Sequence, residues 1–203
     1  MPTFPTRLLA ALAVVLVVGG PARADVKLPR VIGPNMVLQR DTPARVWGWA
    51  EPGEKVTVTL GDHTATATAD KNRCWEVTLP AMKAGGPFEL VVTGVNTVKV
   101  PNVLVGEVWF CSGQSNMALG VVKTLNADKE IAAADFPKIR LFTAPTRESK
   151  EPTDDVAADW LVCSPKTVSY FSAAAYYFGR ELHQKLGVPV GLVVSAVNGT
   201  RIE

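Results

Sequence analysis

A mostly apolar run that stops abruptly at a polar turn constrains the fold of this chain more than any other feature. Residues 103–111 read Val-Leu-Val-Gly-Glu-Val-Trp-Phe-Cys, and the polar stretch 112–116 follows at once. Such a run predicts a buried strand, here residues 103–110, that ends in a tight turn. Gly113 permits a sharp turn because it has no Cβ, and Asn116 is a favourable residue for opening a helix. We therefore expect an α/β region in which a strand passes through a tight turn into a helix.

The predicted turn carries a candidate nucleophile. Ser115 stands at its tip, with Gly113, Gln114 and Asn116 supporting the turn. A strand-turn-helix of this kind lifts a serine hydroxyl and the neighbouring amides above the sheet edge, and the helix N-terminus favours negative charge there. A serine that attacks a carbonyl beside an oxyanion site needs this arrangement. Serine and asparagine are equally common in ordinary turns, so the spacing alone leaves both interpretations open.

The region before this strand, residues 25–102, has the pattern of an all-β domain. Short runs alternate between apolar and polar residues and are separated by glycine-rich turns, which predicts a small antiparallel β-sandwich. The alternating runs are residues 56–60, 64–68, 75–79, 88–92 and 95–100.

The region after residue 102 predicts a parallel sheet with crossover helices. Further strands are expected at residues 139–143 and 190–195, and the segment 147–159 is expected to be a surface loop. Because active loops of parallel sheets gather at the carboxyl ends of the strands, Ser115 and Gly199 should share one edge. A helix before the last strand is expected to pack on the sheet through apolar side chains at helical spacing, rather than form a platform for sugars. Those side chains are Phe171, Ala175, Phe178, Leu182 and Leu186.

Residues 1–24 have the pattern of a secretory signal peptide. Arg7 precedes an apolar run that is too short to span a bilayer, and residues 22–24 form an Ala-x-Ala cleavage site. The remaining chain is expected to be exported, to the periplasm or the extracellular space, without a membrane anchor. The full sequence has a formal net charge of +2, which includes the arginines of the leader. The remaining charges are dispersed along the chain, which argues against a nucleic-acid partner.

The cysteines and histidines suggest neither a metal centre nor a disulfide scaffold. Cys111 and Cys163 form the most plausible disulfide pair, with buried free thiols as the alternative. Cys111 itself falls inside the predicted strand and is rejected as the nucleophile. The two histidines are far apart in sequence: His63 is placed in a turn of the β-domain, and His183 in the amphipathic helix. Neither is expected to act as a catalytic base, because neither stands at a strand's carboxyl end.

The block 106–117 closely resembles the nucleophile block of the sialate O-acetylesterase family, within the SGNH hydrolase superfamily. The resemblance continues in order through most of the chain after the leader, in residues 35–40, 46–54, 79–90, 163–165, 171–173, 178–182 and 187–192. It implies a fold of the α/β class: a small antiparallel β-sandwich domain (25–102) followed by the first part of a three-layer α/β, SGNH-type (flavodoxin-like) hydrolase domain (103–203).

The sequence departs from the family pattern at two places near the predicted site. Ala118 stands where the family usually has glutamate, and Val197-Asn198-Gly199-Thr200 replaces a Trp-Gly-Gly-Thr block, with Gly199 kept. The family's later Gln-Gly-Glu block and its Asp-x-x-His pair have no counterpart in this sequence. The hydrolase domain is therefore expected to be incomplete, as in an N-terminal fragment of a longer esterase.

The resemblance also implies the chemistry. Ser115 would attack the acetyl carbonyl of an O-acetylated sugar or sialoglycan and form an acetyl-serine intermediate, with no metal or other cofactor. The backbone N–H groups of Ser115 and Gly199 would hold the oxyanion. The alternative is an inactive carbohydrate-binding or interaction module, for which Trp47, Trp49 and Trp75 offer stacking faces.

Overall fold

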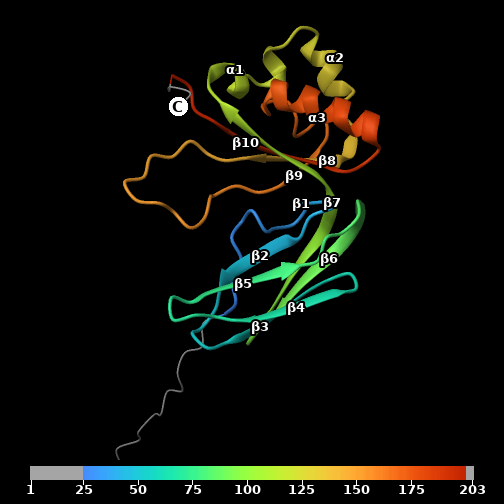
Figure 1. The fold of residues 1–203 in the computed structure, drawn as a ribbon. Coiled ribbons are helices and arrows are strands. Elements are labelled where there is room, and N and C mark those ends of the chain that lie inside the picture. Colours follow the sequence, from blue (N-terminus) through green and yellow to red (C-terminus); the bar gives the residue numbers. More distant parts are fainter. Residues whose placement is uncertain (1–24, 200–203) are drawn as a thin grey trace, which may run out of the picture.

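The computed structural model describes residues 25–199. The leader predicted for residues 1–24 lies outside the described residues, as does Thr200. A β-rich lower part and an upper part with helices are joined by one long strand, β7 (Figure 1). This arrangement is the α/β fold expected from the sequence. No described helix has both the length and the apolar character needed to cross a membrane.

The lower part is a sandwich of two sheets. β2 (Ala44–Trp49) and β5 (Cys74–Leu79) pair antiparallel as a two-stranded sheet. Opposite them lie β3 (Lys55–Leu60), β4 (His63–Thr68), β6 (Gly85–Thr93) and the first half of β7 (Thr97–Gly113). Alternate side chains point inward from both sheets into one apolar core, which confirms the sandwich predicted from the alternation. The core includes Val46, Val58, Val77, Leu90 and Val100.

β7 continues beyond the sandwich into a second sheet. Its first half pairs with β6, and residues 104–106 pair parallel with β1 (Val37–Gln39). Its last seven residues pair parallel with β10 (Val190–Ala196). β10 pairs parallel with β8 (Phe136–Thr143), and β9 (Leu161–Cys163) adds an antiparallel edge. The boundary predicted at residue 102 falls inside β7, so the two regions share a strand.

The described helices lie together on the upper side of this second sheet (Figure 1). α3 (Ala173–Leu186) contacts β10 and β8, and the short α1 (Ser115–Ala118) contacts β7 and α3. The 3-10 turn η1 (Val121–Lys123) packs with α2 (Ala127–Ala132). Within the described residues, the hydrolase region has two layers, a sheet and the helices on one side of it. The sequence led us to expect three layers.

The face that α3 presents to the sheet agrees with the prediction for Ala175 and Leu182 but differs from it elsewhere. Its buried residues are Ala173, Ala175, Tyr176 and Gly179, whereas Phe178 is 41% exposed. A Cβ on Gly179 would lie 2.6 Å from a methyl carbon of Leu192, so the helix approaches the sheet through its small residues. The predicted stripe was wrong for Phe178, which packs edge-on against Trp109 with ring centroids 5.0 Å apart. It was also wrong for Leu186, which is 47% exposed.

A testable consequence of the shared strand concerns Gly106, where β7 passes from one sheet to the other. A Cβ there would lie 2.0 Å from the carbonyl oxygen of Pro189, a backbone atom that cannot move aside without displacing β10. We expect Gly106→Ala to lower the free energy of unfolding by about 3 kcal/mol, the upper range for overpacking. Urea unfolding followed by circular dichroism measures this change.

The matched control is Gly85→Ala. Gly85 pairs with Val105 next to the same crossover, but its nearest neighbours for a Cβ are ring atoms of Phe88 at 3.6 Å and beyond, an ordinary contact distance. The control should change stability by less than about 0.5 kcal/mol. Equal effects of the two substitutions would contradict a tight crossover at Gly106.

Candidate active site

Ser115 lies in a tight turn at the carboxyl end of β7, as predicted. β7 ends at Gly113, whose φ of 154° is disfavoured for residues with a side chain. Gln114 is the N-cap residue, and Ser115 is the exposed first residue of α1. Asn116 therefore lies inside the helix rather than opening it. The helix is one turn of four residues, so Ser115 is presented by the turn geometry more than by a long helix dipole.

The single turn of α1 is held in place by α3. The carbonyl of Leu119, just after α1, accepts a hydrogen bond of 2.8 Å from the Ala173 N–H. Ser172, the buried N-cap of α3, accepts from the Ala175 N–H at 3.2 Å and lies 3.4 Å from the Met117 sulfur. The nucleophile candidate thus sits on a turn that is fixed to a 14-residue helix.

The structure brings the Gly199 loop to the same edge as Ser115. Ala196, the last residue of β10, is in register with Gly113, the last residue of β7. The Val197 N–H donates to the Gly113 carbonyl at 3.1 Å, which ties the two loops together. Gly199 is exposed, with a φ of 74° that favours glycine. Parallel pairing therefore places both predicted residues at one carboxyl edge.

A cavity of about 410 Å³ lies beside the nucleophile. Its lining combines residues from the Ser115 turn, the η1 segment, the segment before α3 and the loop after β10. They are Ser115, Ala118, Leu119, Gly120, Val122, Lys123, Tyr170 and Asn198. Ala118 and Asn198, the two departures from the family pattern, both form part of this wall. The cavity joins the predicted nucleophile to the loop that carries the predicted oxyanion glycine.

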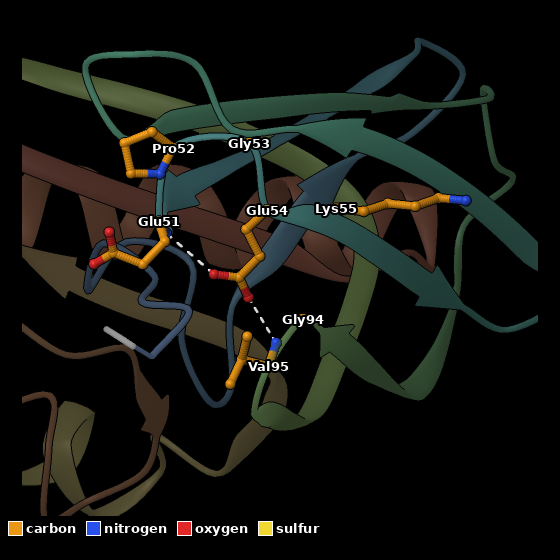
Figure 2. A pocket seen from close by; sticks show the side chains of 7 residues that line it. All are labelled: Glu51, Pro52, Gly53, Glu54, Lys55, Gly94 and Val95. Atoms are coloured by element: carbon orange, nitrogen blue, oxygen red, sulfur yellow. Dashed lines mark hydrogen bonds between the residues drawn. The ribbon is translucent and has the colours of Figure 1, made fainter. Parts of the chain in front are cut away.

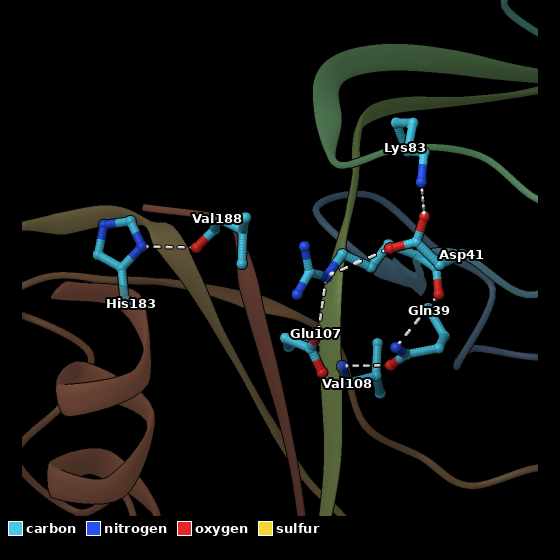
Figure 3. A network of polar contacts seen from close by, with 8 residues as sticks. Gln39, Asp41, Lys83, Glu107, Val108, His183 and Val188 are labelled. Carbon is cyan, nitrogen blue, oxygen red and sulfur yellow. Dashed lines mark hydrogen bonds and ion pairs between the residues drawn. The ribbon is translucent and has the colours of Figure 1, made fainter. Parts of the chain in front are cut away.

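Neither histidine lines this cavity. His63 is the first residue of β4 rather than part of the turn before it, and lines a separate cavity with Met82 and Phe88. His183 lies near the end of α3, where its Nδ1–H donates to the Val188 carbonyl at 2.7 Å (Figure 3). That bond fixes the turn from α3 into β10, which is a structural role. That neither histidine acts as a base stays a prediction, and neither of them lines the Ser115 cavity.

No carboxylate lines the cavity either, within the described residues. Glu107, the carboxylate on β7, is engaged by Arg40 at 2.7 Å, and the Gln39 side-chain carbonyl accepts from the Val108 N–H at 2.8 Å (Figure 3). Asp155 accepts from the Arg30 N–H at 2.8 Å, so it ties the loop before β9 to the start of the chain. These acidic groups therefore have structural partners.

A separate cavity of about 530 Å³ lies at the turns of the sandwich. Glu54 closes these turns, because its carboxylate accepts from the Glu51 N–H at 3.1 Å and from the Val95 N–H at 2.6 Å (Figure 2). Glu51 in turn bonds Arg73 at 2.6 Å. Among the residues that the structure describes, no group of three or more acidic, cysteine or histidine side chains could hold a metal ion.

The three cysteines are free thiols, which is one of the two alternatives left open for Cys111 and Cys163. Cys111 lies on β7 and Cys163 on β9, and β10 and β8 run between them. Three strand spacings amount to about 14 Å, well beyond the reach of a disulfide. Burial raises the pKa of the Cys163 thiol to about 12 and also raises the pKa of Cys111. A half-buried protonated thiol inside a strand is a poor nucleophile, as the sequence argument held.

The fold and the comparisons with known proteins indicate the same class of protein. The chain superposes on the crystal structure of a carbohydrate acetylesterase from Xanthomonas citri with a TM-score of 0.86 and 36% identity, over 88% of this chain and 42% of that one. It is 39% identical over 189 residues to mouse sialate O-acetylesterase, a match covering 83% of this chain and 35% of the mouse protein. The human enzyme is 37% identical over 193 residues, covering 85% and 37%. No protein-family model matches.

The described residues thus have the α/β fold of a carbohydrate acetylesterase. The chain is similar to the N-terminal portion of sialate O-acetylesterases, and it spans between 35 and 37% of the length of the curated relatives that it matches. Both findings confirm the resemblance drawn from the block 106–117 and its neighbours.

The thiol environments predict an order of chemical labelling. In native protein at pH 8, a thiol reagent should modify exposed Cys74 first and Cys111 slowly, because burial keeps Cys111 protonated. Cys163, with no exposed surface, should react only after denaturation. Mass spectrometry of labelled peptides, with no reductant added, should find all three thiols in denaturant. Recovery of a linked Cys111–Cys163 peptide would contradict the strand order.

Proposed function

We propose that this chain carries the nucleophile of a serine esterase that removes O-acetyl groups from sialic acids or related acetylated carbohydrates. One observation carries the proposal: Ser115 shares a cavity with Asn198, the neighbour of Gly199, at the edge where β7 and β10 end together. Similarity to sialate O-acetylesterases supports the acetyl ester and the sugar as the reacting groups.

The proposed reaction begins when the Ser115 hydroxyl oxygen attacks the acetyl carbonyl and gives up its proton. The N–H groups of Ser115 and Gly199 would donate to the oxygen that becomes negative, each worth about 3–4 kcal/mol in the transition state. Collapse releases the sugar hydroxyl and leaves an acetyl-serine, which water then hydrolyses. The attack needs a base, and within the described residues no histidine or carboxylate lines the cavity. An external base therefore belongs in the test.

The test measures Ser115-dependent acetyl transfer from an aryl acetate in the presence of imidazole. We expect an acetyl adduct on the tryptic peptide that contains Ser115, and acetate release beyond the rate of imidazole alone. Both signals should disappear in Ser115→Ala, a loss of at least about 100-fold, because the nucleophile itself is gone. Peptide mass spectrometry and an acetate assay provide the two readouts.

Ser112→Ala is the matched control, since Ser112 is an exposed serine on the same strand end but does not line the cavity. It should retain the acetyl adduct and the rate. Acetylation that persists in folded Ser115→Ala, or that is missing from the folded parent chain, would overturn the assignment of Ser115.

The site of action is also a proposal. The pattern of residues 1–24 supports export to the periplasm or the extracellular space, where acetylated glycans would be the partners. Signal cleavage after Ala24 should leave a chain that begins at Asp25, and N-terminal sequencing of secreted protein tests this.

One observation favours the alternative, a glycan-binding role for the sandwich. Trp47 and Trp49 lie on the outward face of β2, where Trp47 is 39% exposed and directly opposite Glu76. They line a cavity of about 290 Å³ together with Asp70. Exposed indole faces beside carboxylates can stack on and hydrogen-bond a sugar. Trp75 lines the same cavity, but it is buried and packs in the core of the sandwich.

If the sandwich holds glycans, Trp47→Ala should weaken binding to an acetylated oligosaccharide about tenfold, because a stacking face is removed. Isothermal titration calorimetry measures the affinity. Trp109→Ala is the control, since Trp109 is 43% exposed but lies on β7 away from this cavity. Equal affinities in the parent and both variants would exclude this role for Trp47.

A further inference from the structure

Among the described residues, one charged side chain lines the cavity beside Ser115. Seven of its eight lining residues are neutral, and the eighth is Lys123. We propose that the Lys123 ammonium binds the carboxylate of an anionic acetylated sugar and makes this site prefer such sugars over neutral ones. This specificity role rests on the proposed function, because it concerns the substrate that Ser115 attacks.

The backbone that carries Lys123 is firmly anchored. The Val121 N–H donates to the Phe171 carbonyl at 3.1 Å, and the Val122 N–H donates to the Ser169 carbonyl at 2.9 Å. Val121 is itself fully buried, and the Lys123 N–H donates to the Gly120 carbonyl at 2.9 Å. The stem of Lys123 therefore starts from a fixed point, while its side chain remains exposed.

The hydrogen bonds that anchor Lys123 also place Tyr170 across from it. Tyr170 lies between Ser169 and Phe171, the two residues that accept from η1, and its side chain is 87% exposed. Both side chains line the cavity with Ser115. A charged group and an aromatic face on two segments joined by hydrogen bonds suit a sugar ring that bears a carboxylate.

Lys123 is also available for an external anion. In the part of the chain that the structure describes, its ammonium makes no ion pair. Glu130 of the adjoining α2 is engaged by Arg180 at 2.6 Å. Because no described carboxylate lines the wall, the positive charge of Lys123 favours an anion over a neutral sugar of the same shape.

The experiment compares two substrates that differ only in this charge: 9-O-acetyl-N-acetylneuraminic acid and its methyl ester. The readout is the ratio of kcat/KM for the acid to that for the ester, from Ser115-dependent acetate release with imidazole present. We expect Lys123→Gln to lower this ratio about fivefold, because the substitution removes a partly exposed ion pair with the substrate carboxylate. Lys123→Arg should restore most of it, and added salt should lower the parent ratio toward that of Lys123→Gln.

Lys129→Gln is the matched control, because Lys129 is an exposed lysine on α2 that does not line the cavity. Its ratio should equal that of the parent. A ratio that is unchanged in Lys123→Gln, or lowered equally in Lys129→Gln, would overturn the role of Lys123.

Binding provides a readout that does not depend on turnover. In Ser115→Ala protein, calorimetry or ligand-observed NMR gives the affinity ratio for the acid and its methyl ester, and Lys123→Gln on that background should lower it about fivefold. A chain that never acetylates Ser115 but shows this charge-dependent binding would refute the esterase proposal and retain the Lys123 site. Equal affinities for acid and ester would refute the Lys123 site alone.

Discussion

One continuous strand determines where every other part of this molecule lies. β7 runs for 17 residues and pairs in succession with β6, β1 and β10. Since the backbone hydrogen bonds of a strand fix the register of its neighbours, the sandwich and the α/β sheet cannot shift independently. The turn that carries Ser115 follows directly from the last residue of this strand. The position of Ser115 is thus fixed by a strand whose first half belongs to the sandwich.

A buried guanidinium holds β7 to β8 where the two sheets meet. Arg140 is only 4% exposed, and its nitrogens donate to carbonyl oxygens of Pro137, Asn35 and Asn102 at 3.0 to 3.3 Å. Asn35 and Asn102 both have left-handed backbones, with φ of 69° and 60°, and Asn102 also donates to Asn35. Burial lowers the pKa of Arg140, because no described carboxylate compensates its charge. The neutral carbonyl dipoles that accept these hydrogen bonds offset the cost of removing the guanidinium from water. The junction is therefore stable in the one geometry that keeps these hydrogen bonds.

Sequence reasoning predicted those features that depend on local pattern. Alternation in residues 56–60 and 75–79 gave strands because each inward side chain enters one core. The turn at Gly113 was also predictable from a local pattern, because the apolar run ends there at a glycine followed by polar residues. Whether Cys111 and Cys163 are bonded could not be decided from the sequence, because the order of strands is not written in any local pattern: β10, the last described strand, inserts between β7 and β8. The stripe on α3 was predicted correctly at Ala175 but not at Phe178, because the close approach of Gly179 to the sheet is not visible in a pattern of large apolar residues.

The same distinction explains where this chain departs from the family pattern. Ser115 and Gly199 are positioned by backbone contacts, namely the β7–β10 register and the bond from the Val197 N–H to the Gly113 carbonyl. Ala118 and Asn198 line the cavity, and a hydrogen bond of 2.9 Å from the Ala118 backbone N–H to the Gln114 carbonyl holds Ala118 in place. A glutamate at position 118 would therefore change the charge of the wall without changing these backbone contacts. In a site of this kind the fold sets where the serine and the glycine lie, while the side chains of the wall can vary independently of it.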